Sequence, residues 1–124
     1  MEEVTEFSGI VQDGKKRGKG LGFPTANVSL TKDIAEGIYL SRTKVDETWY
    51  PSLTFIGSAK TFGDTTFQAE IYILSFHEDL YQKEIINRLI KKIRSNRKFH
   101  SAEALVAQMQ EDERVAKEYF AKNT

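Results

Sequence analysis

The stretch Gly18-Lys19-Gly20-Leu21-Gly22-Phe23-Pro24-Thr25-Ala26-Asn27 is the most distinctive part of this chain. Glycine lets the backbone approach a ligand closely and turn its amides toward phosphate oxygens. Lys19 adds a positive charge that attracts the same oxygens. Together with Gly14 shortly before it, the stretch therefore indicates a nucleotide-binding loop. Its candidate residues are Gly14, Gly18, Lys19 and Gly22.

Pro24 predicts a fixed turn just before two side chains that carry oxygen donors. It sets its own φ and pushes Phe23 toward an extended conformation. Because residues two apart in an extended stretch face the same side, Thr25 and Asn27 can act together. The Thr25 hydroxyl and an oxygen of Asn27, from its side chain or its carbonyl, suit a hard cation such as Mg²⁺. We expect both residues to hold the metal and to take part in nucleotide binding.

A plainer interpretation of residues 14–27 is a glycine-rich hairpin loop with solvated lysines. The Walker spacing is absent, because no Gly-Lys pair is followed by Ser or Thr. The dinucleotide-binding pattern also fails, because Phe23-Pro24 interrupts the helix that should start at the last glycine. Local chemistry leaves both interpretations open.

Outside this loop, short alternating or apolar runs predict an antiparallel sheet or barrel. Turn signals such as Asp13-Gly14 and Gly63-Asp64 separate the runs. In the fourth run, Glu70 shares a face with Tyr72, opposite the most apolar side chains. The runs cover residues 7–11, 37–45, 48–56, 66–75 and 84–93.

The last segment has a helical period. Ser101 suits an N-cap and Glu103 fits the positive first turn. Apolar residues then recur at helical spacing, which predicts a helix over residues 102–120 that covers an open face of the barrel. These apolar residues are Leu105, Met109, Ala116 and Phe120.

Residues 84–93 are ambiguous in period. Ile85, Leu89 and Ile93 have helical spacing, whereas the alternate residues from Ile86 to Arg94 suit a strand. Periodicity alone leaves both open.

Composition places the chain among small single-core domains, since 124 residues have room for one core. The 18 basic and 18 acidic residues balance, so no nucleic acid or anionic membrane is expected as a partner. Cysteine is absent, which excludes disulfides and thiolate metal sites. No apolar stretch is long enough to span a bilayer, and Met1-Glu2-Glu3 is unlike a signal peptide. We expect a cytoplasmic monomer.

Taken in order, the motifs resemble the riboflavin kinase family, and in particular the kinase domain of bacterial bifunctional riboflavin kinase/FAD synthetases. The similarity runs from about residue 7 to residue 120. The matching segments are Gly9-Ile10-Val11, Gly14, Arg17–Asn27, Gly37-Ile38-Tyr39, Tyr50-Pro51, Ile56-Gly57, Lys60-Thr61-Phe62, Ala69–Leu74, Glu78–Tyr81, Ile93-Arg94 and Lys98–Ser101.

The resemblance implies a mainly β fold, a six-stranded antiparallel Greek-key barrel with one C-terminal helix. It therefore favours a strand over residues 84–93. It implies a single domain over residues 1–124, with the barrel at about 5–100 and the helix at about 102–120. It also implies a kinase that transfers the γ-phosphate of Mg-ATP to the ribityl 5′-hydroxyl of riboflavin, giving FMN and ADP.

The same resemblance assigns roles to single residues. Glu70 corresponds to the catalytic base, although a lone glutamate on a strand is otherwise usually solvated. Glu78 and Asp79 look like acids of a polar turn.

Arg94, Phe99 and Ser101 fall in the segment along the flavin site of the family. A guanidinium can bond polar ring atoms and a phenyl ring can pack on isoalloxazine. Ser101 also has a plain explanation as the helix cap, and most of the basic run over residues 88–98 is explained by a solvated face.

Five residues at four sites depart from the family pattern. They are Lys19, Lys60, Tyr72 and Ser95-Asn96, where members often carry Arg, Pro, His and Pro-Glu. The departures bear on nucleotide choice and the shape of the flavin pocket more than on the reaction. Bacterial members also commonly carry an N-terminal adenylyltransferase domain that this sequence lacks. A complete chain is expected to stop at FMN, and the alternative is that the chain is the excised kinase half of a bifunctional enzyme; the sequence leaves both open.

The alternative to an enzyme is a non-catalytic small β-barrel. Such a barrel could be a flavin or nucleotide sensor, or could bind single-stranded nucleic acid through aromatics such as Trp49, Tyr50 and Tyr81. Formation of FMN from riboflavin and ATP separates the two hypotheses.

Overall fold

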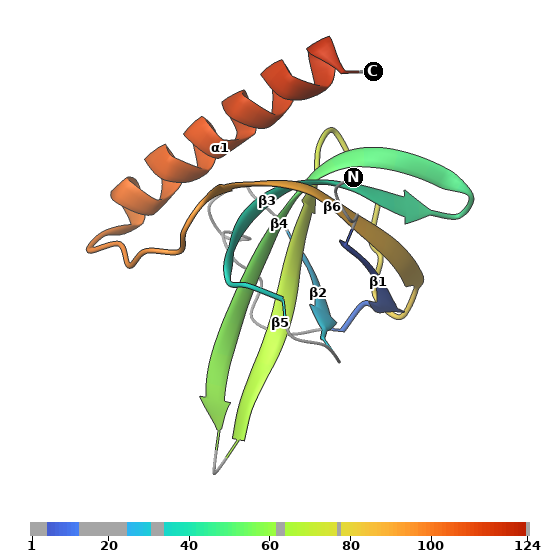
Figure 1. Cartoon of the computed structure of the whole chain (residues 1–124), viewed down its shortest axis with the longest axis horizontal. Helices are drawn as coiled ribbons and strands as arrows, with labels where there is room; N and C mark the ends of the chain where they lie inside the picture. The colour runs from blue at the N-terminus through green and yellow to red at the C-terminus, as the bar shows by residue number, and fades with distance from the viewer. Residues whose placement is uncertain (1–4, 13–24, 31–33, 62–63, 77, 124) are drawn as a thin grey trace.

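Within residues 5–12, 25–30, 34–61, 64–76 and 78–123, which the computed structural model describes, the chain forms six antiparallel strands and one helix (Figure 1). The expected barrel with a C-terminal helix is confirmed. The elements are β1 Thr5–Ile10, β2 Ala26–Ser29, β3 Gly37–Val45, β4 Thr48–Thr61, β5 Asp64–Ile73, β6 Glu84–Arg94 and α1 Ala102–Lys122.

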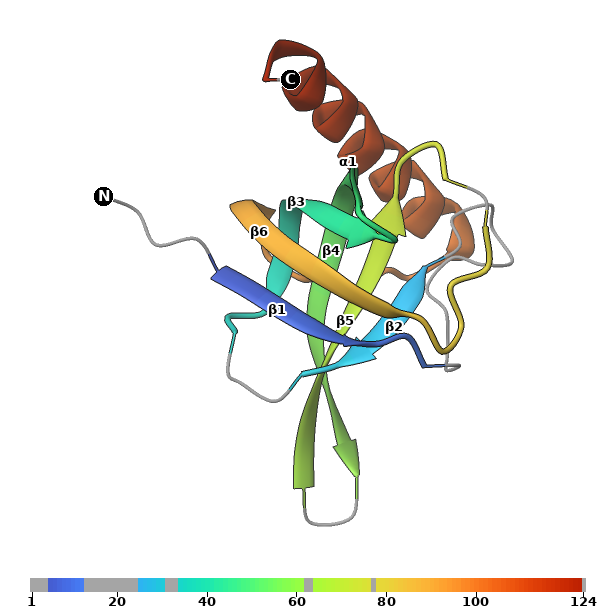
Figure 2. The ribbon, with the colours of Figure 1, turned by 90° about the vertical axis from the view of Figure 1, so that its right-hand side faces the viewer.

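The strands lie in the order β1-β6-β3-β4-β5-β2, and the two edge strands come together to nearly close the barrel (Figure 2). The backbone N–H of Gln12 donates to the carbonyl of Asn27 at 2.7 Å. Gly9 allows the close approach, because a Cβ there would lie 2.5 Å from Cγ1 of Val28. Beyond the barrel, β4 and β5 continue as a projecting two-stranded ribbon (Figures 1 and 2).

The interior of the barrel contains both an apolar cluster and a buried hydroxyl network. Side chains such as Val28, Ile56 and Ile71 form the apolar part. The network consists of side chains that are all 0% exposed and that bond one another at 2.6–2.9 Å. Because each buried group has a partner, the network fastens β3, β4 and β6 together. Its members are Ser41, Thr43, Ser52, Thr54 and Asn87.

Helix α1 covers the outer face of the sheet, as its apolar period predicts (Figure 1). Met109, Ala116 and Phe120 pack against outward-facing residues of β3 and β4. Ser101 caps the helix, since its Oγ accepts a hydrogen bond from the Ala104 N–H at 3.1 Å. The helix continues two residues past the expected end at 120, and Asn123 closes it by donating to the Tyr119 carbonyl.

The ambiguous hydrophobic period of residues 84–93 has a structural cause in strand β6. Its pairing with β3 shifts register twice, which leaves Ile90 and Ile93 without partners in β3. A residue added to one strand turns the following side chains to the other face. The first half of β6 therefore points Ile85 and Leu89 into the barrel, while Ile90 and Ile93 pack under the helix. The strand interpretation of residues 84–93 is confirmed.

The hairpin between β3 and β4 turns through Asp46 and Glu47, with φ values of 47° and 76°. Two-residue hairpin loops of this kind prefer glycine, because a Cβ in the left-handed region costs roughly 1–2 kcal/mol. We expect Glu47→Gly to raise the free energy of unfolding by about 1 kcal/mol, measured by urea denaturation. Glu47→Ala is the matched control, since it removes the same carboxylate and keeps the Cβ. Equal stability of the two variants would show that the turn is not strained.

Candidate functional site

Thr25 and Asn27, the predicted metal ligands, lie at the start of β2 and are only 5% and 4% exposed. The Oγ1 atom of Thr25 makes no hydrogen bond with any residue in the described part of the chain. Buried hydroxyls normally have a partner, so this oxygen suits a ligand from outside the protein. Hydroxyl and amide oxygens are donors that a hard divalent cation accepts, so these two residues fit such a metal.

Glu70, the predicted base, lies on β5 directly opposite Asn27 of β2 and opposite Phe55 of β4. Side chains at directly opposed positions share a face, with Cβ atoms about 4.5–5.5 Å apart. Glu70 is half-buried and faces away from the barrel interior, which its neighbour Ala69 lines. The fold therefore brings together Asn27 and Glu70, which are 43 residues apart in the chain.

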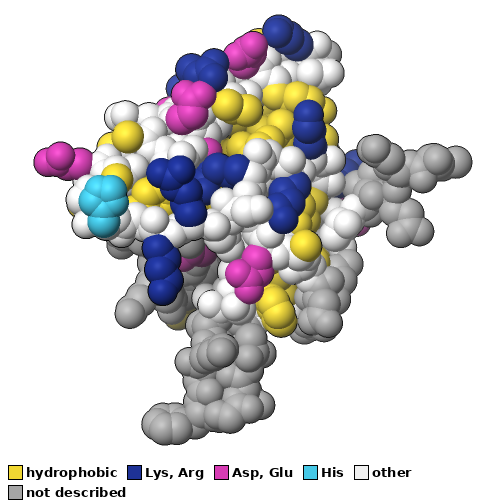
Figure 3. Space-filling view, turned by 60° about the vertical axis from the view of Figure 1, so that its left-hand side comes forward, with side chains coloured by type: hydrophobic (Ala, Val, Ile, Leu, Met, Phe, Trp, Pro, Cys, Tyr) yellow, Lys and Arg dark blue, Asp and Glu magenta, His cyan; other side chains and the backbone are white. Residues whose placement is uncertain are grey.

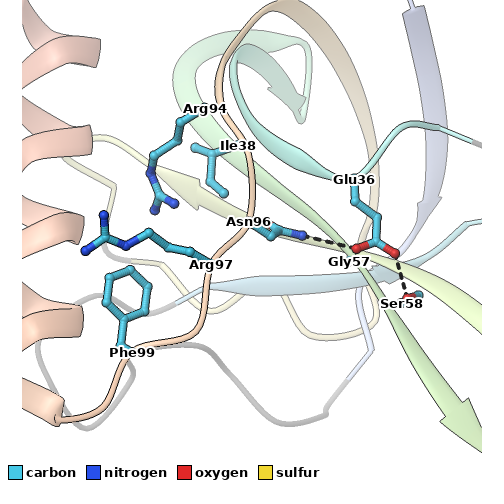
Figure 4. A pocket seen from close by; sticks show the side chains of 8 residues that line it. All are labelled: Glu36, Ile38, Gly57, Ser58, Arg94, Asn96, Arg97 and Phe99. Carbon is cyan, nitrogen blue, oxygen red and sulfur yellow. Dashed lines mark hydrogen bonds between the residues drawn. The ribbon is translucent and has the colours of Figure 1, made fainter.

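A pocket of about 150 Å³ opens on the same outer face (Figure 4). Gly57 lines it and follows Phe55 by two residues, so Gly57 lies on the diagonal from Glu70 at roughly 7–8 Å between Cα atoms. The predicted base is therefore close to the pocket edge. The lining residues are Glu36 and Ile38 near the start of β3, Gly57 and Ser58 of β4, Arg94 at the end of β6, and Asn96, Arg97 and Phe99 beyond it.

Arg94, predicted to bind flavin, lines the pocket but points its donors at helix α1. Its Nε and Nη2 donate to the two carboxylate oxygens of Asp112 at 2.9 and 2.7 Å. The side chains of Arg94 and Asp112 are only 18% and 2% exposed. Gln108 adds a third bond to the same carboxylate at 3.0 Å. Arg94 therefore joins the end of β6 to the helix.

Phe99, the second predicted flavin residue, lines the same pocket, and the guanidinium of Arg97 lies 4.9 Å from the centre of its ring. The third, Ser101, is the helix cap and does not line this pocket.

Figure 3 shows one face of the molecule, on which Lys and Arg side chains gather beside hydrophobic ones. Among the described residues, Arg97 has no carboxylate partner, and its neighbour Lys98 is exposed.

Asn96 ties the segment after β6 to the sheet. Its Nδ2 donates to the Ile56 carbonyl at 2.9 Å and to Oε2 of Glu36 at 3.4 Å. Glu36 in turn accepts a hydrogen bond from the Ser58 hydroxyl at 2.7 Å. These bonds fix one wall of the pocket, with Arg97 and Phe99 at the other end (Figure 4).

Tyr72, one of the departures from the family pattern, lies two residues from Glu70 on the same face. Its hydroxyl donates to Oε2 of Glu113 on α1 at 2.5 Å. Burial, followed by the bond to Glu113, raises the pKa of Tyr72 well above its usual range. Tyr72 therefore stays protonated at neutral pH and connects β5 to the helix beside the predicted base.

The predicted phosphate-binding residues Gly14, Gly18, Lys19 and Gly22 lie outside the described residues. Asp79 accepts a hydrogen bond from the Tyr81 N–H, as expected for an acid in a polar turn. Within the described ranges, no three His, Cys, Asp or Glu residues gather as a metal site. No helix in the described part of the chain has the length and apolar character needed to cross a bilayer.

The sequence reasoning missed Asp112 and Asn96 as partners of the pocket. A signal for Asp112 was present, because it falls between Met109 and Ala116 on the apolar stripe of the helix. An acid in such a stripe indicates a buried cation opposite. Asn96 carried no comparable signal, since its partners on β4 and before β3 are 40 and 60 residues away.

A family model and a curated relative that match this sequence both carry the description riboflavin kinase. The family model described as Flavokinase, riboflavin kinase, matches residues 1–120. A bifunctional riboflavin kinase/FMN adenylyltransferase of Listeria monocytogenes is 35% identical over 118 residues, covering 92% of this chain and 38% of the relative. The chain thus spans about two fifths of the length of that relative.

Two solved structures are also similar. A riboflavin kinase from Trypanosoma brucei aligns with a TM-score of 0.67 at 26% identity, covering 98% of this chain and 82% of that one. A structure described as a macrolide-efflux protein from Streptococcus pneumoniae aligns with a TM-score of 0.84 at 30% identity, over 90% of this chain and 38% of that one.

Proposed function

The chain belongs to the riboflavin kinase family, and we propose that it transfers the γ-phosphate of ATP to the ribityl 5′-hydroxyl of riboflavin, giving FMN and ADP. The observation that carries this proposal is the direct opposition of Asn27 and Glu70 on the face that also holds the pocket. Phosphoryl transfer needs an oriented hydroxyl, a held triphosphate and neutralised charge. On this surface, Glu70 is the candidate for orienting the hydroxyl, and Asn27 is a candidate ligand for a metal that neutralises the charge.

In this proposal, Glu70 orients the 5′-hydroxyl of riboflavin and accepts its proton. The hydroxyl oxygen forms a bond to the γ-phosphorus, the bond from that phosphorus to the bridging oxygen breaks, and ADP leaves. Phe99 packs on the flavin ring in this proposal, and Arg94 and Ser101 act on the flavin side by fixing the end of β6 and the start of α1. Amides of residues 14–22, with Lys19, hold the phosphates.

Members of this family use ATP and a divalent metal. We propose that the metal is Mg²⁺ and that Thr25 and Asn27 hold it, because Thr25 offers a buried oxygen and Asn27 lies directly opposite Glu70. When bound, the cation neutralises charge on the triphosphate. Thr25 and Asn27 contribute by fixing oxygen donors at the start of β2.

The test of the function is direct. Incubation of the protein with riboflavin, ATP and Mg²⁺, followed by chromatography, is expected to yield FMN and an equal amount of ADP. Absence of FMN under conditions in which an established riboflavin kinase forms it would refute the proposal. FMN formed with another divalent metal and not with Mg²⁺ would refute the choice of metal and leave the kinase activity standing.

We expect Thr25→Val to raise the KM for Mg-ATP about tenfold, or ~1.4 kcal/mol, and to raise the Mg²⁺ concentration needed for half-maximal rate. Valine keeps the shape of threonine and removes the oxygen. Thr48→Val is the matched control, because Thr48 is an exposed strand residue away from the site. Initial rates of FMN formation over a grid of ATP and Mg²⁺ concentrations measure both effects. Unchanged values for Thr25→Val would remove Thr25 from the metal site.

The proposal also covers domain organisation, location and partners. Residues 1–124 form a single kinase domain, which works as a cytoplasmic monomer on small molecules. The equal numbers of acidic and basic residues support small molecules over nucleic acid as partners, because they give no general attraction for nucleic acid. The non-catalytic alternative has no observation in its favour.

A further inference from the structure

The pocket contains two arginines, and they differ in how firmly their guanidinium groups are held. Nε and Nη2 of Arg94 donate to the carboxylate of Asp112, and its Nη1 donates to the Ser95 carbonyl at 3.2 Å. These bonds are also buried against the helix. The guanidinium of Arg94 could turn toward a flavin only by breaking the link between β6 and α1.

Arg97 is in the opposite situation. It is exposed and lines the same pocket, and its guanidinium lies 4.9 Å from the centre of the Phe99 ring. Exposed cation–π contacts are weak, so the guanidinium is easily moved from the ring. Phe99 is at the same time the aromatic surface on which a flavin would stack.

The backbone that carries Arg97 and Phe99 is held in place from the other side. Asn96 is bonded to the Ile56 carbonyl at 2.9 Å, immediately before Arg97 in the chain. Figure 4 shows Arg97 and Phe99 together at one end of the pocket, and Glu36 with Ser58 at the other. The side chain of Arg97 can therefore move while its Cα stays at the pocket wall.

We propose that Arg97 is the residue that recognises the polar end of the flavin ring, and that Arg94 positions the helix. The inference deepens the proposed function and rests on it. The ring takes the place of the guanidinium on Phe99, and the guanidinium donates to a carbonyl oxygen at C2 or C4 of the pyrimidine ring. The pocket volume of about 150 Å³ agrees with this, since it is smaller than the roughly 300–1,000 Å³ of pockets that enclose a whole drug-sized ligand. It accommodates one end of the three-ring system.

The test compares riboflavin with its 2-thio and 4-thio analogues, in which sulfur replaces one carbonyl oxygen and accepts hydrogen bonds more weakly. Calorimetric titration into the full chain with Mg-ADP present gives the Kd of each ligand. We expect the wild-type protein to bind one of the two analogues several-fold more weakly than riboflavin. Arg97→Met should weaken riboflavin binding about tenfold or more and abolish this preference, because the charged donor is lost.

Lys98→Met is the matched control, since it removes a neighbouring exposed cation that does not line the pocket. It should behave as the wild type, and the KM for Mg-ATP should be unchanged in both variants. An Arg97→Met protein with wild-type affinity and wild-type preference, in a wild type that forms FMN, would overturn the role of Arg97 and leave the kinase proposal standing. A wild type that neither binds riboflavin nor forms FMN would overturn both.

Discussion

Glu70→Gln is expected to lower kcat for FMN formation by about 10²–10⁴-fold while both substrates still bind. Glutamine keeps the size of the side chain and its ability to hydrogen-bond the 5′-hydroxyl, but it cannot accept a proton at neutral pH. The loss should therefore appear in kcat more than in KM. Initial rates of FMN formation and calorimetric binding of riboflavin measure the two quantities separately.

Glu78→Gln is the matched control for this variant. Glu78 is exposed in the turn after β5, so the same change of charge should leave kcat at the wild-type value. Full activity of Glu70→Gln would refute the role of Glu70 as base. Equal losses in the two variants would show that net charge, and not a positioned carboxylate, is responsible.

Asp112→Ala is expected to lower the free energy of unfolding by about 3–5 kcal/mol. The substitution leaves the largely buried guanidinium of Arg94 without its counter-charge and also removes the partner of Gln108. A typical domain has only about 5–15 kcal/mol of stability in total, so the change is large. Urea denaturation followed by circular dichroism measures it.

Arg114→Ala is the contrasting variant on the same helix. Arg114 pairs with Glu111 and Glu118 at exposed positions, where solvent screens the charges. Its urea midpoint should remain close to that of the wild type. A loss in Asp112→Ala no greater than that in Arg114→Ala would contradict the role of the buried pair in fastening the helix.

The local pattern of the sequence was sufficient for most elements of the fold. The runs around β3, β4 and β5 alternate regularly, because each strand has one face in the barrel and one under the helix. Strand β2 was harder to predict, since Ala26–Ser29 has only four residues and is stabilised by pairing with β5 and the contact of Gln12 with Asn27. The period of β6 was ambiguous for a physical reason, which is its two register shifts against β3.

The candidate site was predictable only where a motif carried it. Thr25 and Asn27 follow a proline turn, and Glu70 lies in the segment Ala69–Leu74 that resembles the family, so all three were named from the sequence. The partner of Arg94 was not, because the pairing depends on how α1 packs across the sheet. Arg97 could not be distinguished in the sequence from the other cations of the basic run, because its contact with Phe99 depends on how the segment after β6 folds back.

The most direct test of the account is a single-turnover experiment with ATP labelled at the γ-phosphate. Wild-type protein saturated with riboflavin should transfer the label to FMN, while Glu70→Gln, shown by calorimetry to bind both substrates, should leave the label in ATP. Label that stays in ATP or appears as free phosphate with the wild type, or transfer by Glu70→Gln at the wild-type rate, would contradict it.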